Sequence, residues 1–175
     1  MELLGGTIGF ESTEGKGTTF FFTIPFIPSK PDTTPFVSRS SVTAQKPNFQ
    51  NKVILVVEDD LISFQFIEIL LRNTKARLIH VKNGEDAIEV CQVMEKLDLV
   101  LMDMQLPFMD GYEATARIKS IRPSLPVIAQ TANAMSADRI KSLEAGCSEF
   151  IPKPINPDEL LMVITNQLIK QTEPT

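Results

Sequence analysis

Short apolar runs alternate with stretches of helical periodicity from Lys52 onward. The runs are KVILVV, ARLIHV, LDLVLM, LPVIAQ and EFI, and apolar residues recur three or four positions apart between them. Strands that are apolar throughout suit a parallel sheet covered on both faces, and strict alternation of strand and helix requires right-handed crossovers. The pattern therefore predicts an α/β domain over residues 52–170, a doubly wound (βα)5 sheet of five parallel strands with five helices.

Each predicted helix has an apolar face that we expect to pack against this sheet. The five faces are Phe64, Ile67 and Leu71; Ala87, Cys91 and Met94; Ala114, Ile118 and Ile121; Ile140 and Leu143; and Leu161, Ile164 and Leu168. Gly84 and Gly146 stand at boundaries where turns are needed, and Asn156 followed by Pro157 predicts the start of the last helix.

Residues 1–26 show the alternation of a β-hairpin. TIGFES and TTFFFTIPF flank the turn TEGKG, and the side chains expected on one face of the second strand are Phe20, Phe22, Ile24 and Phe26. Because two strands alone are marginally stable, we expect weak packing here. GKGTT is not a phosphate-binding P-loop, since Phe10 and Gly17 stand where GxxxxGK[ST] requires glycine and a hydroxyl residue.

The remaining segments have no apolar period. Residues 27–51 are rich in Pro, Ser and Thr and predict a flexible linker, and residues 171–175 are a short tail.

Composition narrows the functional classes. A net charge of -5 without a basic run argues against nucleic acid as a partner. Cys91 and Cys147 are isolated, which predicts buried thiols in a reducing cytosol and no disulfide or zinc site. No window is long and apolar enough to span a bilayer, and MELLGGTIG has no leader pattern. We therefore expect a cytoplasmic chain without membrane contact, which leaves open a membrane-anchored parent protein.

Reactive side chains stand where four of the five predicted strands end. They are Glu58, Asp59 and Asp60 after the first strand, Asp103 after the third, Thr131 after the fourth and Lys153 after the fifth. Functional groups gather at the carboxyl ends of the strands in such a sheet. Carboxylates that converge from neighbouring strands repel one another unless a cation lies among them, and an all-oxygen set suits Mg²⁺. The strand ends therefore predict a magnesium site.

Asp103, Thr131 and Lys153 extend this site to phosphoryl transfer. A carboxylate nucleophile, a magnesium ion, an ammonium and a hydroxyl group are the groups that such chemistry uses. A single Asp after an apolar strand is more often a cap or turn residue, so the hypothesis depends on the coincidence of four strand ends.

Three other residues have simpler interpretations. Asp110 is expected to cap a helix that starts near Tyr112. His80, the only histidine, lies in an apolar strand and is expected to be partly buried and structural. Phe150, three residues before Lys153, is compatible with a place in the core.

These residues also match a known family. Residues 52–170 resemble the receiver domain of two-component response regulators through VVEDD, LVLMDMQLPFMDGYE, AQTA and PKP. The resemblance implies a flavodoxin-like receiver fold with strand order 2-1-3-4-5. It also implies that Asp103 is the phosphoacceptor, that Glu58 and Asp59 are the acidic pair that binds Mg²⁺, and that the backbone carbonyl of Gln105 is a further ligand.

The resemblance assigns roles to the later motifs as well. Thr131 and Lys153 would contact the phosphoryl group, Phe150 would be the aromatic switch whose ring turns inward as Thr131 moves, and Lys153-Pro154 would be a cis peptide. The sequence departs from the family at two positions, because Glu58 stands where Asp is more common and Gln130 stands where an apolar residue is usual.

Residues 1–26 resemble a second family, the sensor histidine kinases. GGTIGFES, the turn with Gly15 and Gly17, and TTFFFTIP are similar to the last hairpin of the kinase ATP-binding domain. Because the parts that hold ATP and the phosphoacceptor histidine are not in the sequence, this resemblance implies a kinase remnant without kinase activity.

Together these features predict the C-terminal piece of a hybrid sensor histidine kinase. Asp103 would accept a phosphoryl group from the phosphohistidine domain of a histidine kinase, with self-catalysed modification and slow hydrolysis. Phosphorylation would shift the loop after Thr131 and the helix with Ile140 and Leu143. Because no output segment follows Thr175, the group is expected to pass to a histidine phosphotransfer protein or to tune the parent kinase. The alternatives are a small aspartyl-phosphate phosphatase or mutase, and a degenerate receiver that acts only as a binding module.

Overall fold

The computed structural model describes residues 6–13, 15–23, 25, 47–132 and 136–170. These residues fall into two compact units, an N-terminal unit that contains residues 6–25 and a larger unit that contains residues 47–170. Most of the predicted linker, residues 27–46, and the predicted tail at residues 171–175 lie outside the described residues.

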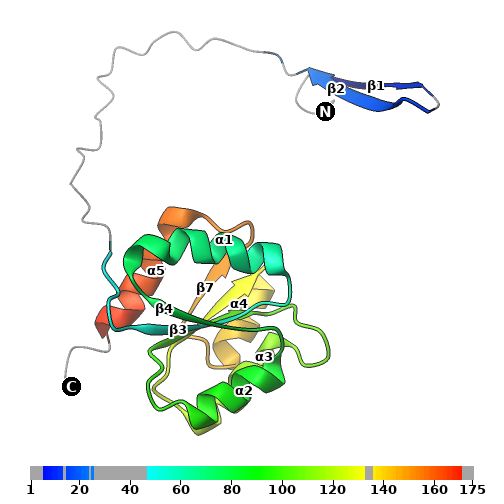
Figure 1. Cartoon of the computed structure of the whole chain (residues 1–175). Coiled ribbons are helices and arrows are strands. Elements are labelled where there is room, and N and C mark those ends of the chain that lie inside the picture. Colours follow the sequence, from blue (N-terminus) through cyan, green and yellow to red (C-terminus); the bar gives the residue numbers. More distant parts are fainter. Residues whose placement is uncertain (1–5, 14, 24, 26–46, 133–135, 171–175) are drawn as a thin grey trace, which may run out of the picture. The chain divides into compact units, whose positions relative to one another are not determined.

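The larger unit is built on a five-stranded parallel sheet (Figure 1). Its strands are β3 (Val53–Val57), β4 (Arg77–Val81), β5 (Leu99–Asp103), β6 (Val127–Thr131) and β7 (Glu149–Pro152). They lie in the order β4-β3-β5-β6-β7. With β3 counted as the first strand of the domain, this confirms the predicted order 2-1-3-4-5.

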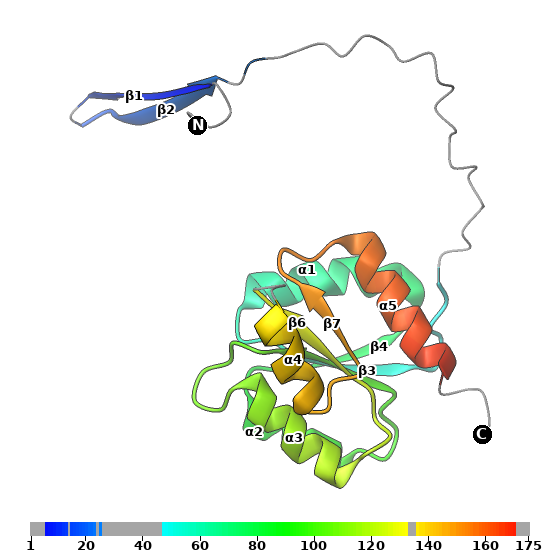
Figure 2. The same ribbon diagram turned by 180° about the vertical axis from the view of Figure 1, so that it is seen from behind.

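The helices cover both faces of this sheet (Figures 1 and 2). They are α1 (Leu61–Leu71), continued by the short 3-10 helix η2 (Arg72–Thr74), then α2 (Gly84–Val93), α3 (Gly111–Ile121), α4 (Ser136–Glu144) and α5 (Pro157–Lys170). Helices α1 and α5 lie on one face, and α2 and α3 lie on the other. Among the described residues, no helix is long and apolar enough to cross a membrane.

Alternate residues of the strands pack into two separate hydrophobic cores, one on each face of the sheet. The core under α1 and α5 includes Ile54, Val56, Leu99, Leu101, Ile128, Ile151, Ile67, Leu71, Leu160 and Ile164. The core under α2 and α3 includes Leu55, Val57, Val100, Met102, Ala129, Ala87, Cys91, Ala114 and Ile118. Every residue of β3, β5 and β6 is buried, because both faces of these strands are covered.

The predicted helix faces were wrong at three positions. Ile121 is 42% exposed because α3 ends there, three residues beyond the buried Ile118. Ile140 and Leu143 in α4 are 54% and 53% exposed. Among the α4 side chains that the structure describes, the buried one is Ser142, whose hydroxyl donates a hydrogen bond to the Asp138 carbonyl, so Ile140 and Leu143 face solvent.

Polar caps fix the starts of the helices near the carboxyl ends of the strands. Asp110 accepts a hydrogen bond from the Glu113 N–H, and α3 begins at Gly111, one residue earlier than expected. Asn156 accepts from the N–H groups of Asp158 and Glu159, which confirms the predicted start of α5.

The larger unit begins before Lys52, so the predicted linker was too long at its end. Phe49 is 4% exposed and packs into the core under α1 and α5, and its N–H donates to the Thr74 carbonyl at 2.6 Å. A single aromatic residue in a polar stretch produces no period, which is why the pattern did not reveal it.

The N-terminal unit is the predicted hairpin. Strand β1 (Thr7–Thr13) pairs antiparallel with β2 (Gly17–Thr23), from Thr7 opposite Thr23 to Thr13 opposite Gly17. Gly15 and Gly17 have φ of 75° and 103°, which glycine adopts without strain. The apolar side chains of the hairpin are exposed, namely Ile8, Phe10, Phe20, Phe21 and Phe22. Ile24 and Phe26, which we expected on one of its faces, lie outside the described residues.

We predict that Phe49→Ala lowers the free energy of unfolding of the larger unit by about 3 kcal/mol, because truncation of a buried Phe removes its contacts and leaves a cavity. Val93→Ala in α2, where Val93 is 73% exposed, is the control and should change stability by less than about 0.5 kcal/mol. Urea unfolding followed by circular dichroism measures both. Equal stabilities of the two variants would show that Phe49 is not part of the core.

Candidate functional site

The predicted carboxylates meet at the carboxyl end of the sheet. Glu58 and Asp59 follow β3, and Asp103 ends β5 beside it. One oxygen from each of the three lies within 4.8 Å of the others. Glu58 and Asp103 are 1% and 4% exposed, whereas Asp59 is exposed. The sheet thus brings two buried charges and one accessible charge together.

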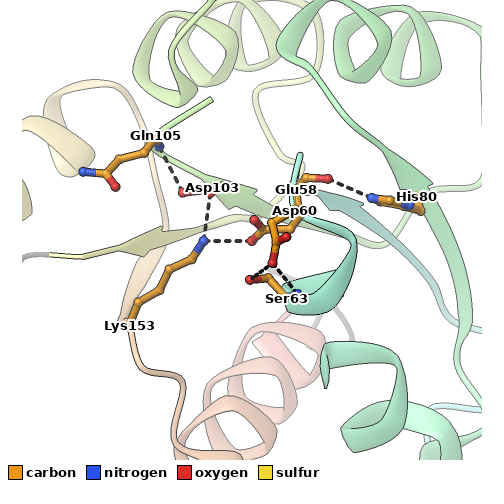
Figure 3. A network of polar contacts seen from close by, with 7 residues as sticks. All are labelled: Glu58, Asp60, Ser63, His80, Asp103, Gln105 and Lys153. Carbon is orange, nitrogen blue, oxygen red and sulfur yellow. Dashed lines mark hydrogen bonds and ion pairs between the residues drawn. The ribbon is translucent and has the colours of Figure 1, made fainter. Parts of the chain in front are cut away.

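Lys153 is the cation that lies among these carboxylates (Figure 3). Its Nζ donates to Glu58 Oε2 and to Asp103 Oδ2, each at 2.8 Å. The backbone N–H of Lys153 donates to the Thr131 carbonyl at 2.7 Å, which links the end of β7 to the end of β6. The Lys153-Pro154 peptide is cis, as the family resemblance implied.

Burial and pairing act on the proton affinities of this cluster in opposite directions. Burial raises the pKa of the Glu58 carboxyl above its usual 4.5, although the hydrogen bond from Lys153 opposes the shift. Burial lowers the pKa of Lys153, but hydrogen bonds to Asp103 and Glu58 outweigh it and raise that pKa above the usual 10.5. Lys153 is therefore held in its charged form.

Asp103 is also held by the backbone that follows it. The Gln105 N–H donates to Asp103 Oδ1 at 3.0 Å, and the Gln105 side chain is exposed (Figure 3). The two Asp103 oxygens therefore face different donors, the Lys153 ammonium and a backbone amide.

Thr131 and Phe150 lie on the strands next to Asp103. Thr131 ends β6 and is 3% exposed. Phe150 in β7 is half-buried against the core under α2 and α3, and the Arg139 guanidinium of α4 lies 5.3 Å from its ring centroid. The cation–π contact with Arg139 was not predicted, because no local sequence pattern relates these two residues. Residues 133–135 of the loop after Thr131 lie outside the described residues.

Asp60 and His80 support the cluster without joining it. Asp60 is exposed and accepts from both the N–H and the hydroxyl of Ser63, which makes it the cap of α1 (Figure 3). The ring of the partly buried His80 stacks on the ring of Phe64, with 3.8 Å between the ring centroids. His80 Nε2 lies 2.8 Å from the Glu58 carbonyl oxygen, which is the geometry of an N–H that donates to this oxygen. The structural interpretation of His80 is thus confirmed, and its contact with the Glu58 backbone is new.

Gly111, the first residue of α3, sets how closely this helix approaches the site. A Cβ at this position would clash with the Asp103 carbonyl oxygen and would lie 2.7 Å from Met104 Cα. Glycine is therefore the residue that lets the start of α3 pack directly against the end of β5. The Asp-Gly pair after the strand was the available signal.

The donor chemistry of the cluster fits a hard divalent cation. Carboxylate oxygens from Glu58, Asp59 and Asp103 are the ligands that Mg²⁺ prefers, and the exposure of Asp59 leaves access for water ligands. The acidic cluster is consistent with magnesium binding at this site.

We predict that Glu58→Gln alters the pH dependence of stability in the metal-free chain. Because the pKa of Glu58 is raised in the folded state, the proton on Glu58 binds more tightly to the folded chain than to the unfolded chain. This contribution to the free energy of unfolding is fully present below pH 4.5 and is lost as the pH rises through the folded-state pKa. The stability of the unmodified chain relative to Glu58→Gln should therefore fall as pH rises from 4.5. Urea unfolding in EDTA at successive pH values measures the difference. A relative stability that rises with pH would mean that pairing with Lys153 outweighs burial.

Comparisons with known proteins agree with this geometry. Residues 54–165 match the family described as the response regulator receiver domain. The autoinducer 1 sensor kinase/phosphatase LuxN of Vibrio campbellii is 31% identical, in an alignment that covers 98% of this chain and 22% of LuxN. The chain therefore spans less than a quarter of the length of this relative.

Two solved structures are similar to the larger unit. The receiver domain of sensor histidine kinase PA1611 from Pseudomonas aeruginosa, with magnesium coordinated in its active-site cleft, is 34% identical with a TM-score of 0.63, covering 67% of this chain and 98% of that chain. A co-crystal structure of the Saccharomyces cerevisiae phosphotransfer protein Ypd1 and the receiver domain of Ssk1 matches at 28% identity with a TM-score of 0.67. The match covers 71% of this chain and 94% of that chain. With its sheet order, acidic cluster and family match, the chain belongs to the response regulator receiver domain family of two-component signalling.

Proposed function

We propose that this receiver accepts a phosphoryl group on Asp103 from a phosphohistidine, in the presence of Mg²⁺. The observation that carries the proposal is the Lys153 ammonium, which lies 2.8 Å from both Asp103 and Glu58 within the acidic cluster. A buried carboxylate beside a fixed cation and a candidate metal site is suited to receive a phosphoryl group, because charge neutralisation and positioning supply most of the rate.

The residues that would hold the ion are Glu58, Asp59 and Asp103, with the backbone carbonyl of Gln105 as a further ligand. The magnesium ion in the PA1611 receiver, which is 34% identical to this chain, supports the assignment. When bound, Mg²⁺ supplies charge neutralisation for the phosphoryl oxygens and helps to orient them. The longer side chain of Glu58, in place of the more common Asp, reaches Lys153 as well as the acidic cluster.

In the proposed transfer, Asp103 is the nucleophile. A carboxylate oxygen forms a bond to phosphorus as the nitrogen–phosphorus bond of the phosphohistidine breaks, and the electron pair of that bond stays on the imidazole. The Gln105 N–H orients the Asp103 carboxylate during this step. Lys153 then pairs with the new phosphoryl oxygens and the Thr131 hydroxyl donates to one of them. Slow hydrolysis, in which water attacks the phosphoryl group and the same receiver catalyses the step, releases inorganic phosphate and returns Asp103 to its free carboxylate.

Phosphorylation would be communicated through Thr131, Phe150 and α4. The Phe150 ring lies between the core and Arg139, so inward movement of Thr131 would give the ring a second place to pack. Such a movement shifts a two-state equilibrium and changes the surface that α4 offers with the exposed Ile140 and Leu143.

The partners that we propose follow from the family. The donor is the phosphohistidine domain of a histidine kinase, and the acceptor is a histidine phosphotransfer protein, as supported by the co-crystal of Ypd1 with the Ssk1 receiver. The match to LuxN, which covers 98% of this chain, supports the assignment of residues 1–26 to the end of a kinase ATP-binding domain. We place the chain in the cytoplasm, without nucleic acid or membrane as a partner of this segment.

We predict that the chain gains one phosphoryl group when it is incubated with acetyl phosphate and Mg²⁺, and that Asp103→Asn abolishes the gain because it removes the nucleophile. Asp110→Asn is the matched control, since Asp110 is an exposed carboxylate in the same loop that caps α3, and Asn also caps helices. This variant should be modified like the unmodified chain. Intact-mass spectrometry measures all three proteins, with EDTA as the metal-free arm.

Two results would contradict the proposed function. Equal modification of the Asp103→Asn variant and the unmodified chain would exclude Asp103 as the acceptor. Steady turnover of an added phosphomonoester would indicate a phosphatase or mutase, which uses an aspartyl-phosphate as an intermediate and not as a signal.

A further inference from the structure

Gln130 is a buried polar residue that lies directly beside Asp103. In the sheet, Gln130 of β6 is in register with Asp103 of β5 on one side and with Ile151 of β7 on the other. Because side chains alternate along a strand, Gln130 shares a face with Ile128, and Asp103 shares that face with Leu101, both in the core under α1 and α5. Gln130 therefore continues the row that Glu58 and Asp103 begin.

The amide of Gln130 has no hydrogen-bond partner in the part of the chain that the structure describes. The side chain is 0% exposed, and both Nε2 and Oε1 are buried without a partner. A buried amide in this condition costs free energy because it has lost its bonds to water without replacement. An unpaired polar group next to a reactive residue is the kind of exception that calls for a functional explanation.

Asp103 is the in-register neighbour of Gln130 on β5. Neighbouring strands lie about 4.8 Å apart, so the side chain of an in-register Gln spans the distance to the adjacent carboxylate. After phosphorylation, the carboxyl oxygen of Asp103 that is not bonded to phosphorus is still a carbonyl acceptor. In the structure Asp103 Oδ1 accepts from the Gln105 N–H and Oδ2 accepts from the Lys153 ammonium, so release of Lys153 would make an acceptor oxygen available to a further donor.

We propose that Gln130 is a positioning residue for Asp103, and that its Nε2–H donates to an Asp103 carboxyl oxygen when the phosphoryl group is in place. This inference rests on the proposed function of Asp103. In the unphosphorylated state the Lys153 ammonium occupies Asp103 and the amide is unpaired. Once Lys153 turns to the phosphoryl oxygens, the amide gains its partner, so Gln130 raises the free energy of the unphosphorylated state relative to the phosphorylated one.

The test compares Gln130→Met with Gln167→Met in the full 175-residue chain. Both changes replace a buried Gln with an apolar side chain of similar length. Gln167 of α5 is remote from Asp103, because it lines a surface pocket together with Glu149, the residue at the amino end of β7. Isothermal titration calorimetry measures the affinity for beryllofluoride with Mg²⁺, which mimics the phosphoryl group. Gln130→Met should bind about tenfold more weakly, the effect of one lost hydrogen bond, and Gln167→Met should bind like the unmodified chain.

Two further readouts do not depend on the affinity. Without metal or beryllofluoride, Gln130→Met should raise the urea midpoint, because it removes an unpaired amide from the core. In the unmodified chain, an Nε2 proton of Gln130 should shift and become protected from exchange when beryllofluoride binds, as nuclear magnetic resonance would show.

The outcomes separate this inference from the proposed function. Equal beryllofluoride affinity of Gln130→Met and the unmodified chain, or an unchanged Gln130 amide signal, would overturn the role of Gln130 while leaving Asp103 as the acceptor. Equal weakening by Gln167→Met would also overturn it, since the effect would then be general loosening of the core. Failure of the unmodified chain to bind beryllofluoride would overturn both proposals.

Discussion

The pairing of Lys153 with Glu58 and Asp103 is the interaction on which the site depends. Two carboxylates that are 1% and 4% exposed would repel each other and lose their solvation without a compensating charge. Lys153 provides that charge at 2.8 Å from each, and its backbone is tied to Thr131. Such a buried network is weak evidence of stability, but it keeps a nucleophile, a cation and a candidate metal site in one place.

The fold brings these groups together because parallel strands end at the same edge. Asp103 ends β5, Glu58 and Asp59 follow β3, and Lys153 follows β7, so a short distance separates residues 50 to 95 positions apart. Two features refine this arrangement. Gly111 allows α3 to start directly against the Asp103 backbone, and Asp60 is turned away from the cluster by its role as the cap of α1.

The sequence predicted the sheet and the residues at its edge, since buried strands and polar strand ends are both readable as patterns. It did not predict the exposed face of α4, because Ile140 and Leu143 form a stripe whose direction depends on Ser142 packing inward. Phe49 was missed because a single aromatic residue has no period. Gln130 was visible as a departure from the family, but its lack of a partner emerges only from the register that sets it beside Asp103.

Chemical trapping of the phosphoryl group would show directly which residue accepts it. Borohydride reduces an acyl phosphate to an alcohol, so reduction of the acetyl phosphate-treated chain followed by peptide mapping marks the modified residue. We expect homoserine in place of Asp103, formed only when Mg²⁺ was present. Reduction at another carboxylate, such as Asp59 or Asp110, or no reduction at any residue, would contradict it.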